Sequence, residues 1–98
     1  MGTRFSFTSE LTEWSRRANW FFLHLGEEQG QEIRDMPLPR GGFGSVKVRA
    51  TVGSSSWEGS IFPSTDNPSY SLPIKKSVRE AEGLKPGQLV TAEVELLT

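Results

Sequence analysis

The chain has 98 residues, of which 35% are hydrophobic and 23% charged, a composition and length typical of one folded, soluble domain. Eleven Lys and Arg residues against twelve Asp and Glu give a net charge of −1, which argues against the strongly basic surface of most nucleic-acid-binding domains. The absence of cysteine excludes disulfides, Cys-based zinc sites and thiol nucleophiles and indicates a reducing compartment, the cytoplasm. No apolar run approaches the roughly 18 residues of a membrane helix.

The first third of the chain predicts two strands and a helix. Residues 4–14 nearly alternate, with Phe5, Phe7 and Leu11 on the apolar face, and predict a half-buried strand. A polar turn over residues 15–19 leads to a second strand over residues 20–25, expected to form a hairpin with the first. Residues 26–36 predict a short helix that Pro37 and Pro39 end.

The remainder predicts four strands and a second helix. After a glycine-rich connector over residues 40–44, strands are expected at 45–52, 56–62, 70–74 and 88–97, and a helix at 75–82. Pro73 places its strand at an edge or at the strand's end. The helix has an apolar stripe of Ile74, Val78 and Ala81, and Gly83 is its expected C-cap. The predicted core positions are Val46, Val48, Ala50, Val52, Ile61, Leu72, Val90, Val94 and Leu96.

The order β-β-α-β-β-β-α-β predicts a single, mainly β domain over residues 1–98. Each long strand has one apolar and one polar face. That pattern favours a small closed or nearly closed antiparallel β-barrel with two short helices, because closure removes exposed sheet edges.

The sequence carries no catalytic constellation. His24 is the only histidine and lies inside an aromatic run, where a packing or rim role is expected. The carboxylate pairs Glu27–Glu28 and Glu80–Glu82 are expected to lie on solvated helix surfaces. We therefore predict no catalytic residue, no metal site and no cofactor, and the sequence leans against an enzyme.

Two groups of residues permit more than one interpretation. The glycine-rich segment of residues 40–44 loosely resembles an RNA-recognition strand, but Ser45 replaces the second stacking aromatic, and the alternative is a hinge. The three tryptophans could line a ligand pocket. We instead predict Trp20 and Trp57 in the core and Trp14 at the surface.

The basic residues are the most informative feature for function. Lys47 and Arg49 share the polar face of one strand, and Lys75 and Arg79 share one face of the second helix. If the barrel brings these four groups to one rim near Trp57, they would bind an anion such as phosphate, sulfate or a carboxylate. The alternative is a solvated basic face balanced by Glu58, Glu93 and Glu95.

An ordered set of short motifs resembles one family. The set consists of residues 40–48, 51–53, Trp57, 60–63, 72–75, 78–79, 83–84 and Gly87, with Trp14, Trp20 and the helix around Ile33 in the first third. It resembles the prokaryotic domain-of-unknown-function family 1905. The resemblance implies a barrel similar to the double-split β-barrels, which include looped-hinge transcription regulators and antitoxins, and it implies no settled activity.

The chain departs from the family at three positions. Gly26 stands where the family often has proline, Ser54 where a second glycine is common, and Glu58 where a basic residue is common. The last departure weakens an anion-binding face.

Two functional hypotheses follow. The first is a non-catalytic barrel that binds an anionic small molecule or partner through Lys47, Arg49, Trp57, Lys75 and Arg79. The second is a nucleic-acid-binding module related to looped-hinge regulators, which the charge balance disfavours. Either could act as a monomer or a homodimer, and neither involves a membrane.

Overall fold

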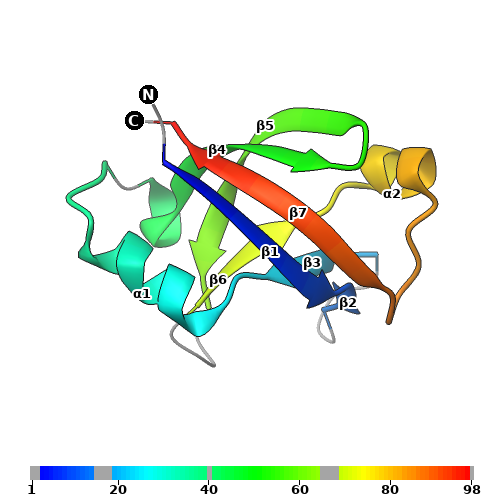
Figure 1. The fold of residues 1–98 in the computed structure, drawn as a ribbon, viewed down its shortest axis with the longest axis horizontal. Coiled ribbons are helices and arrows are strands. Elements are labelled where there is room, and N and C mark those ends of the chain that lie inside the picture. The colour runs from blue at the N-terminus through cyan, green and yellow to red at the C-terminus, as the bar shows by residue number, and fades with distance from the viewer. Residues whose placement is uncertain (1–2, 15–18, 40, 65–68, 98) are drawn as a thin grey trace.

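The computed structural model describes residues 3–14, 19–39, 41–64 and 69–97 and shows a mainly β barrel (Figure 1). The helix α1 (Glu27–Asp35) lies at one end of the barrel and α2 (Lys76–Glu82) at the other. No helix in these ranges is long and apolar enough to cross a membrane.

The strands follow the order that the sequence predicts. The first third contains β1 (Arg4–Glu10), β2 (Thr12–Glu13) and β3 (Phe21–His24), followed by α1. A short 3₁₀ turn, η1 (Gly42–Gly44), leads to β4 (Val46–Val52), β5 (Ser55–Pro63), β6 (Tyr70–Pro73), α2 and β7 (Leu89–Leu96). The mainly β architecture with two short helices is therefore confirmed.

The sheet curls back on itself through its first strand. Its order is β1-β7-β4-β5-β6-β3-β2, and every neighbouring pair is antiparallel. Because only Leu11 separates β1 from β2, the same stretch of chain begins and ends this order. A hydrogen bond of 3.0 Å from the His24 N–H to Ser9 Oγ joins β3 to β1 and nearly closes the barrel.

Within the described residues, the predicted hairpin between the first two strands forms only next to its turn, between β2 and β3. Thr12 and Glu13 pair with Phe22 and Phe21, whereas β1 pairs with β7 along its whole length. Residues 15–18 of the predicted turn, residue 40 of the connector and residues 65–68 of the polar loop lie outside the described residues.

The core lies inside the barrel, where the alternating strands place it. All nine predicted core positions are buried, and Phe5, Phe7, Leu11, Leu23 and Ile74 join them. In β4, the residues from Val46 to Val52 alternate between buried and outward-facing positions, with Thr51 half-buried. Burial of this apolar face is the main source of stability in a domain without disulfides.

Two expectations about packing are wrong. Trp20 is not in the core: its side chain is 42% exposed, and its ring packs against Trp14 and Phe22 at centroid distances of 6.0 and 6.2 Å. These rings shield one another outside the β2–β3 hairpin and do not enter the barrel. Ala81 was expected in the buried stripe of α2 but is exposed, because α2 packs through Val78. Trp14 is 44% exposed, as predicted, and Trp57 is half-buried against the core.

Candidate functional site

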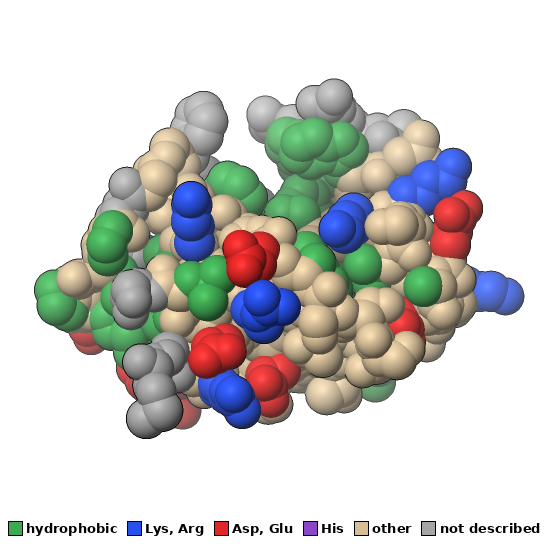
Figure 2. Space-filling view, turned by 90° about the horizontal axis from the view of Figure 1, so that it is seen from above, with side chains coloured by type: hydrophobic (Ala, Val, Ile, Leu, Met, Phe, Trp, Pro, Cys, Tyr) green, Lys and Arg blue, Asp and Glu red, His purple; other side chains and the backbone are tan. Residues whose placement is uncertain are grey.

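A cleft of about 480 Å³ opens in the barrel wall between β5 on one side and β3 and the start of α2 on the other. Figure 2 shows a hollow beside a group of hydrophobic side chains on this face of the molecule. The described lining combines aromatic rings, cations, one carboxylate and strand backbone: Asn19, Trp20, Phe21, Phe22, Trp57, Glu58, Gly59, Ser60, Phe62, Pro73, Ile74, Lys75, Lys76 and Arg79.

The cleft exists because β5 and β6 separate. The two strands pair at Phe62↔Ser71 and Pro63↔Tyr70, and the same register would place Ile61 opposite Leu72 and then Ser60 opposite Pro73. Proline has no N–H to donate, so the ladder cannot continue there. From Pro73 onward the chain turns into α2, while β5 continues along β4.

Trp57 forms the aromatic wall of the cleft on β5. It occupies the register position opposite Ala50, on the face that carries the core, and remains half-buried. Its indole lies along β5 above Gly59, where an added methyl group would come within 3.3 Å of Trp57 Nε1. The Lys75 Nζ lies 5.8 Å from the centre of the Trp57 ring, a cation–π distance. Gly59 therefore makes room for an aromatic ring that carries a cation on its face.

Arg79 supports the opposite wall. Its guanidinium lies 4.2 Å from the centre of the Phe21 ring and donates a hydrogen bond of 2.8 Å to the carbonyl oxygen of Ile74. These two contacts fix the Phe21 ring and the entry into α2. Arg79 is thus partly committed to the structure of the cleft, whereas Lys76 lines the cleft and is exposed.

The five predicted site residues divide into two groups. Trp57, Lys75 and Arg79 line the cleft, but Lys47 and Arg49 lie on the outer face of β4 and do not line it. The structure thus brings three of the five together at one rim. The other two stay outside because β4 alternates strictly, so the burial of Val46, Val48 and Ala50 turns both cations outward.

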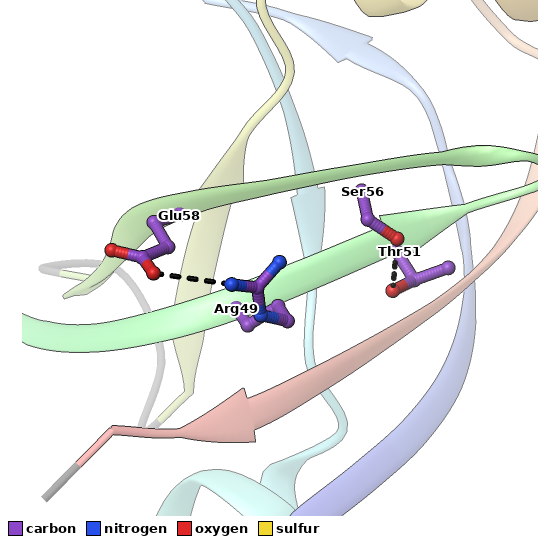
Figure 3. A network of polar contacts seen from close by, with 4 residues as sticks. All are labelled: Arg49, Thr51, Ser56 and Glu58. Atoms are coloured by element: carbon purple, nitrogen blue, oxygen red, sulfur yellow. Dashed lines mark hydrogen bonds and ion pairs between the residues drawn. The ribbon is translucent and has the colours of Figure 1, made fainter.

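The outer face of β4 and β5 carries paired polar groups. Arg49 donates to Glu58 Oε2 at 3.2 Å, and the hydroxyls of Thr51 and Ser56 are 2.9 Å apart (Figure 3). The Arg49–Glu58 pair is exposed, so it contributes at most about 1 kcal/mol. Basic and acidic side chains are interspersed over this face (Figure 2). For Lys47 and Arg49, the structure therefore fits the alternative of a solvated basic face whose charge is balanced by acidic residues.

Sequence reasoning missed most of the aromatic lining. The sequence predicts Phe21, Phe22 and Phe62 as strand residues and Trp20 as a core residue, whereas all four line the cleft. One signal was present. Pro73 marked a strand that had to end or lie at an edge, and the strand next to such a break is where a barrel wall can open.

Two ionisable groups outside the cleft, His24 and Glu82, have structural partners. His24 is half-buried with Nδ1 3.0 Å from Ser71 Oγ, and burial lowers the pKa of its imidazole below 6.5. Hydrogen bonds from the Ser55 and Ser54 hydroxyls lower the pKa of Glu82, which the sequence placed on a free surface, and join the end of α2 to the β4–β5 turn. The described residues contain no group of three or more His, Asp or Glu side chains that could hold a metal ion. The described lining of the cleft offers charge and aromatic surface, with no pairing of a nucleophile and a base.

A family model described as a domain of unknown function (DUF1905) matches residues 7–94. This match covers both helices and at least part of every described strand, and it includes the whole described lining of the cleft. No curated protein sequence matches the chain.

Proposed function

We propose that this chain, which belongs to the family described as a domain of unknown function (DUF1905), is a non-catalytic binding domain whose cleft takes an anionic ligand with an apolar body. The observation that carries the proposal is the Lys75 ammonium 5.8 Å from the Trp57 ring centre within a cleft lined by further aromatic rings. An apolar body would stack on the rings while the anion reaches the cations.

The charges of the described lining favour an anion. Lys75, Lys76 and Arg79 stand against the single carboxylate of Glu58, and Glu58 is already paired with Arg49. A volume of about 480 Å³ falls within the range of small-molecule sites, which are mostly apolar with a few orienting polar groups. The lining comes from one chain, so the proposal suits a monomer or a homodimer. The absence of cysteine supports placing the protein in the cytoplasm.

Binding of 2-naphthoate, followed by calorimetry and tryptophan fluorescence, tests the proposal. We expect the double variant Lys75→Ala/Lys76→Ala to bind it at least tenfold more weakly than the wild type, because both cleft ammonium groups are removed. Arg79 is left intact because it positions Phe21 and Ile74. The neutral analogue 2-naphthalenemethanol should bind the wild type more weakly than the carboxylate.

The matched control is Lys47→Ala/Arg49→Ala, which removes the same charge from the outer face of β4. It should bind 2-naphthoate as the wild type does at constant ionic strength. Equal losses in both double variants would show general electrostatic attraction and contradict a site in the cleft. Equal binding of the neutral analogue would contradict the role of the anion.

A second candidate, binding of single-stranded nucleic acid, is favoured by one observation. The rings of Trp14 and Trp20 are exposed beside the cleft, and exposed aromatics next to cations provide stacking platforms for bases. For duplex DNA we expect only weak, non-specific binding, with Kd of ~10⁻⁴–10⁻⁶ M at physiological salt. Titration of oligothymidylate at several salt concentrations separates the candidates, because phosphate contacts give a steep salt dependence.

A further inference from the structure

The edge of β5 that faces the cleft exposes backbone hydrogen-bonding groups. Successive residues of a strand point their N–H and C=O groups to opposite neighbours. The Ser64 N–H donates to the Ser69 carbonyl, so the groups of Phe62, Ser60 and Glu58 point to the same side as those of Ser64. This is the side of the cleft. Within the described residues, β5 pairs with β6 only at Phe62 and Pro63, so Glu58 and Ser60 have no strand partner there.

The open edge is part of the architecture of the barrel. Pro73 stands where Ser60 would find its partner, and proline cannot supply the donor that the Ser60 carbonyl would accept. On its other edge the same segment of β5 is firmly held, since Ser55 to Ile61 pair with β4. The cleft thus combines a rigid strand edge with an aromatic and cationic opposite wall.

We propose that this edge accepts a short extended peptide carrying a carboxylate, which adds to the sheet as a strand beside β5. This inference rests on the proposed function and names the class of its ligand. A segment of about three residues, roughly 10 Å long when extended, can exchange N–H and C=O bonds with both Glu58 and Ser60. Strand addition gives affinity through the main chain and specificity through alternate side chains.

The surroundings of the edge define the peptide's side chains. Side chains that point to the Trp57 face meet an indole and the Lys75 ammonium, so an apolar residue and a carboxylate are the matching groups. On the other face, the Glu58 carboxylate accepts a hydrogen bond from Arg49, and this cation offsets the repulsion between Glu58 and an acidic peptide. The carboxylate can come from an acidic side chain or from the peptide's C-terminus, and the same cations would bind either.

The first experiment tests the open edge itself by amide hydrogen exchange in the free protein. The amides of Trp57 and Gly59 point to β4 and should exchange at least tenfold more slowly than those of Glu58 and Ser60. Equal protection of all four amides would overturn the inference, because no open edge would then exist.

The second experiment adds four pools of random hexapeptides to labelled protein. The variable positions exclude Asp and Glu, and each pool fixes Glu or Lys at one central position and has either a free or an amidated C-terminus. We expect amide shifts and at least tenfold slower exchange at Glu58 and Ser60 with a carboxylate-bearing pool, and no effect with the amidated Lys pool. A response to the amidated Glu pool assigns the carboxylate to a side chain. A response to the free Lys pool assigns it to the C-terminus.

Two proline variants supply the matched control. Ser60→Pro removes an N–H that faces the cleft and should fold normally but lose the peptide response at least tenfold. Gly59→Pro removes an N–H that pairs with β4 and should lower the melting temperature. If Ser60→Pro does not fold, peptides N-methylated at alternate residues serve instead, and unchanged binding of these peptides would overturn strand addition.

The outcomes separate this inference from the proposed function. Binding of 2-naphthoate without any peptide response at Glu58 and Ser60 would overturn the peptide inference and leave the anion site standing. Loss of both would overturn both. Shifts at Glu58 and Ser60 with oligothymidylate, in the absence of any peptide response, would replace the peptide with single-stranded nucleic acid.

Discussion

The two edges of β5 differ in what they do. Toward β4, the strand pairs from Ser55 to Ile61 above a fully buried core. Toward β6, among the residues that the structure describes, it pairs only at Phe62 and Pro63 and then borders a cleft. One edge serves stability and the other leaves a surface for binding. The difference shows that a single strand can anchor a fold and open a site, provided that its two neighbours diverge.

The divergence comes from local chemistry on the neighbouring strands. Along β4, Val46, Val48 and Ala50 give one continuous apolar face that must stay covered. Along β6, the described ladder with β5 covers Tyr70 and Ser71, and the strand itself ends at Pro73. The cleft therefore lies beside β6, where the strand ends early, and not beside β4, whose apolar face must stay covered.

The largest loss of stability should come from placing a charge on the buried face of β4, the strand that pairs with β5. Val48 is fully buried, and Val48→Asp should unfold the domain, because burying an unpaired charge costs several kcal/mol in a domain stable by only about 5–15 kcal/mol. Lys47→Asp places the same group on the exposed face and should cost about 1 kcal/mol or less. Circular dichroism during urea unfolding measures both. A wild-type transition for Val48→Asp would show that the two faces of β4 are assigned the wrong way round.

Truncating two adjacent residues of β5, one buried and one beside the cleft, should give losses of stability of intermediate size. Ile61 is fully buried, so Ile61→Ala should destabilise the domain by about 2–5 kcal/mol through the lost transfer energy and the cavity left behind. Phe62 lies on the open side with 36% of its surface exposed, and Phe62→Ala should cost only about 1–2 kcal/mol since solvent fills the space. Thermal melting resolves the difference, because 1 kcal/mol shifts the Tm of such a domain by about 4–8 °C. A greater loss for Phe62→Ala would contradict the assignment of the open side.

Variants in the β4–β5 turn test how much the contact between this turn and Glu82 of α2 contributes to stability. Gly53 has a φ of 58°, and an added methyl group would lie 2.1 Å from Glu82 Oε1. Gly53→Ala should cost about 1–2 kcal/mol for the left-handed backbone and also displace the Glu82 carboxylate from its serine donors. Gly83→Ala has a similar φ of 64° with nothing nearby and reports the backbone cost alone. Equal melting temperatures for the two variants would show that the Glu82 contact adds no stability.

The smallest expected effect is a pH dependence on the side of β3 and β6. Burial lowers the pKa of His24 below 6.5, so the folded protein binds the proton less tightly than the unfolded chain. The free energy of unfolding should therefore be highest above pH 6.5 and fall as the pH drops through 6.5 toward the lowered pKa of the folded state. His24→Gln should flatten this part of the profile in urea unfolding at a series of pH values. An unchanged slope in His24→Gln would assign the dependence to other groups.

The sequence alone determined the elements and the core. Strict alternation runs from residue 45 to 52 and from 88 to 97, and proline and glycine stand at the ends of segments. These patterns determine strand phase, helix position and the buried residues of the alternating strands, because they are local consequences of a period of two and of backbone constraints. The family resemblance was likewise carried by local motifs, and residues 7–94 match that family.

The tertiary structure alone decided which side chains meet. It placed Trp20 on the hairpin surface, separated Lys47 and Arg49 from Lys75 and Arg79, and joined Glu82 to a turn almost thirty residues earlier in the chain. Pro73 was visible in the sequence, but its effect depends on the register between β5 and β6 and on the direction in which α2 leaves the barrel. Alternation specifies the face on which a side chain lies, whereas the strand pairing that closes the barrel specifies its neighbours, and that pairing is set by contacts between residues far apart in the chain.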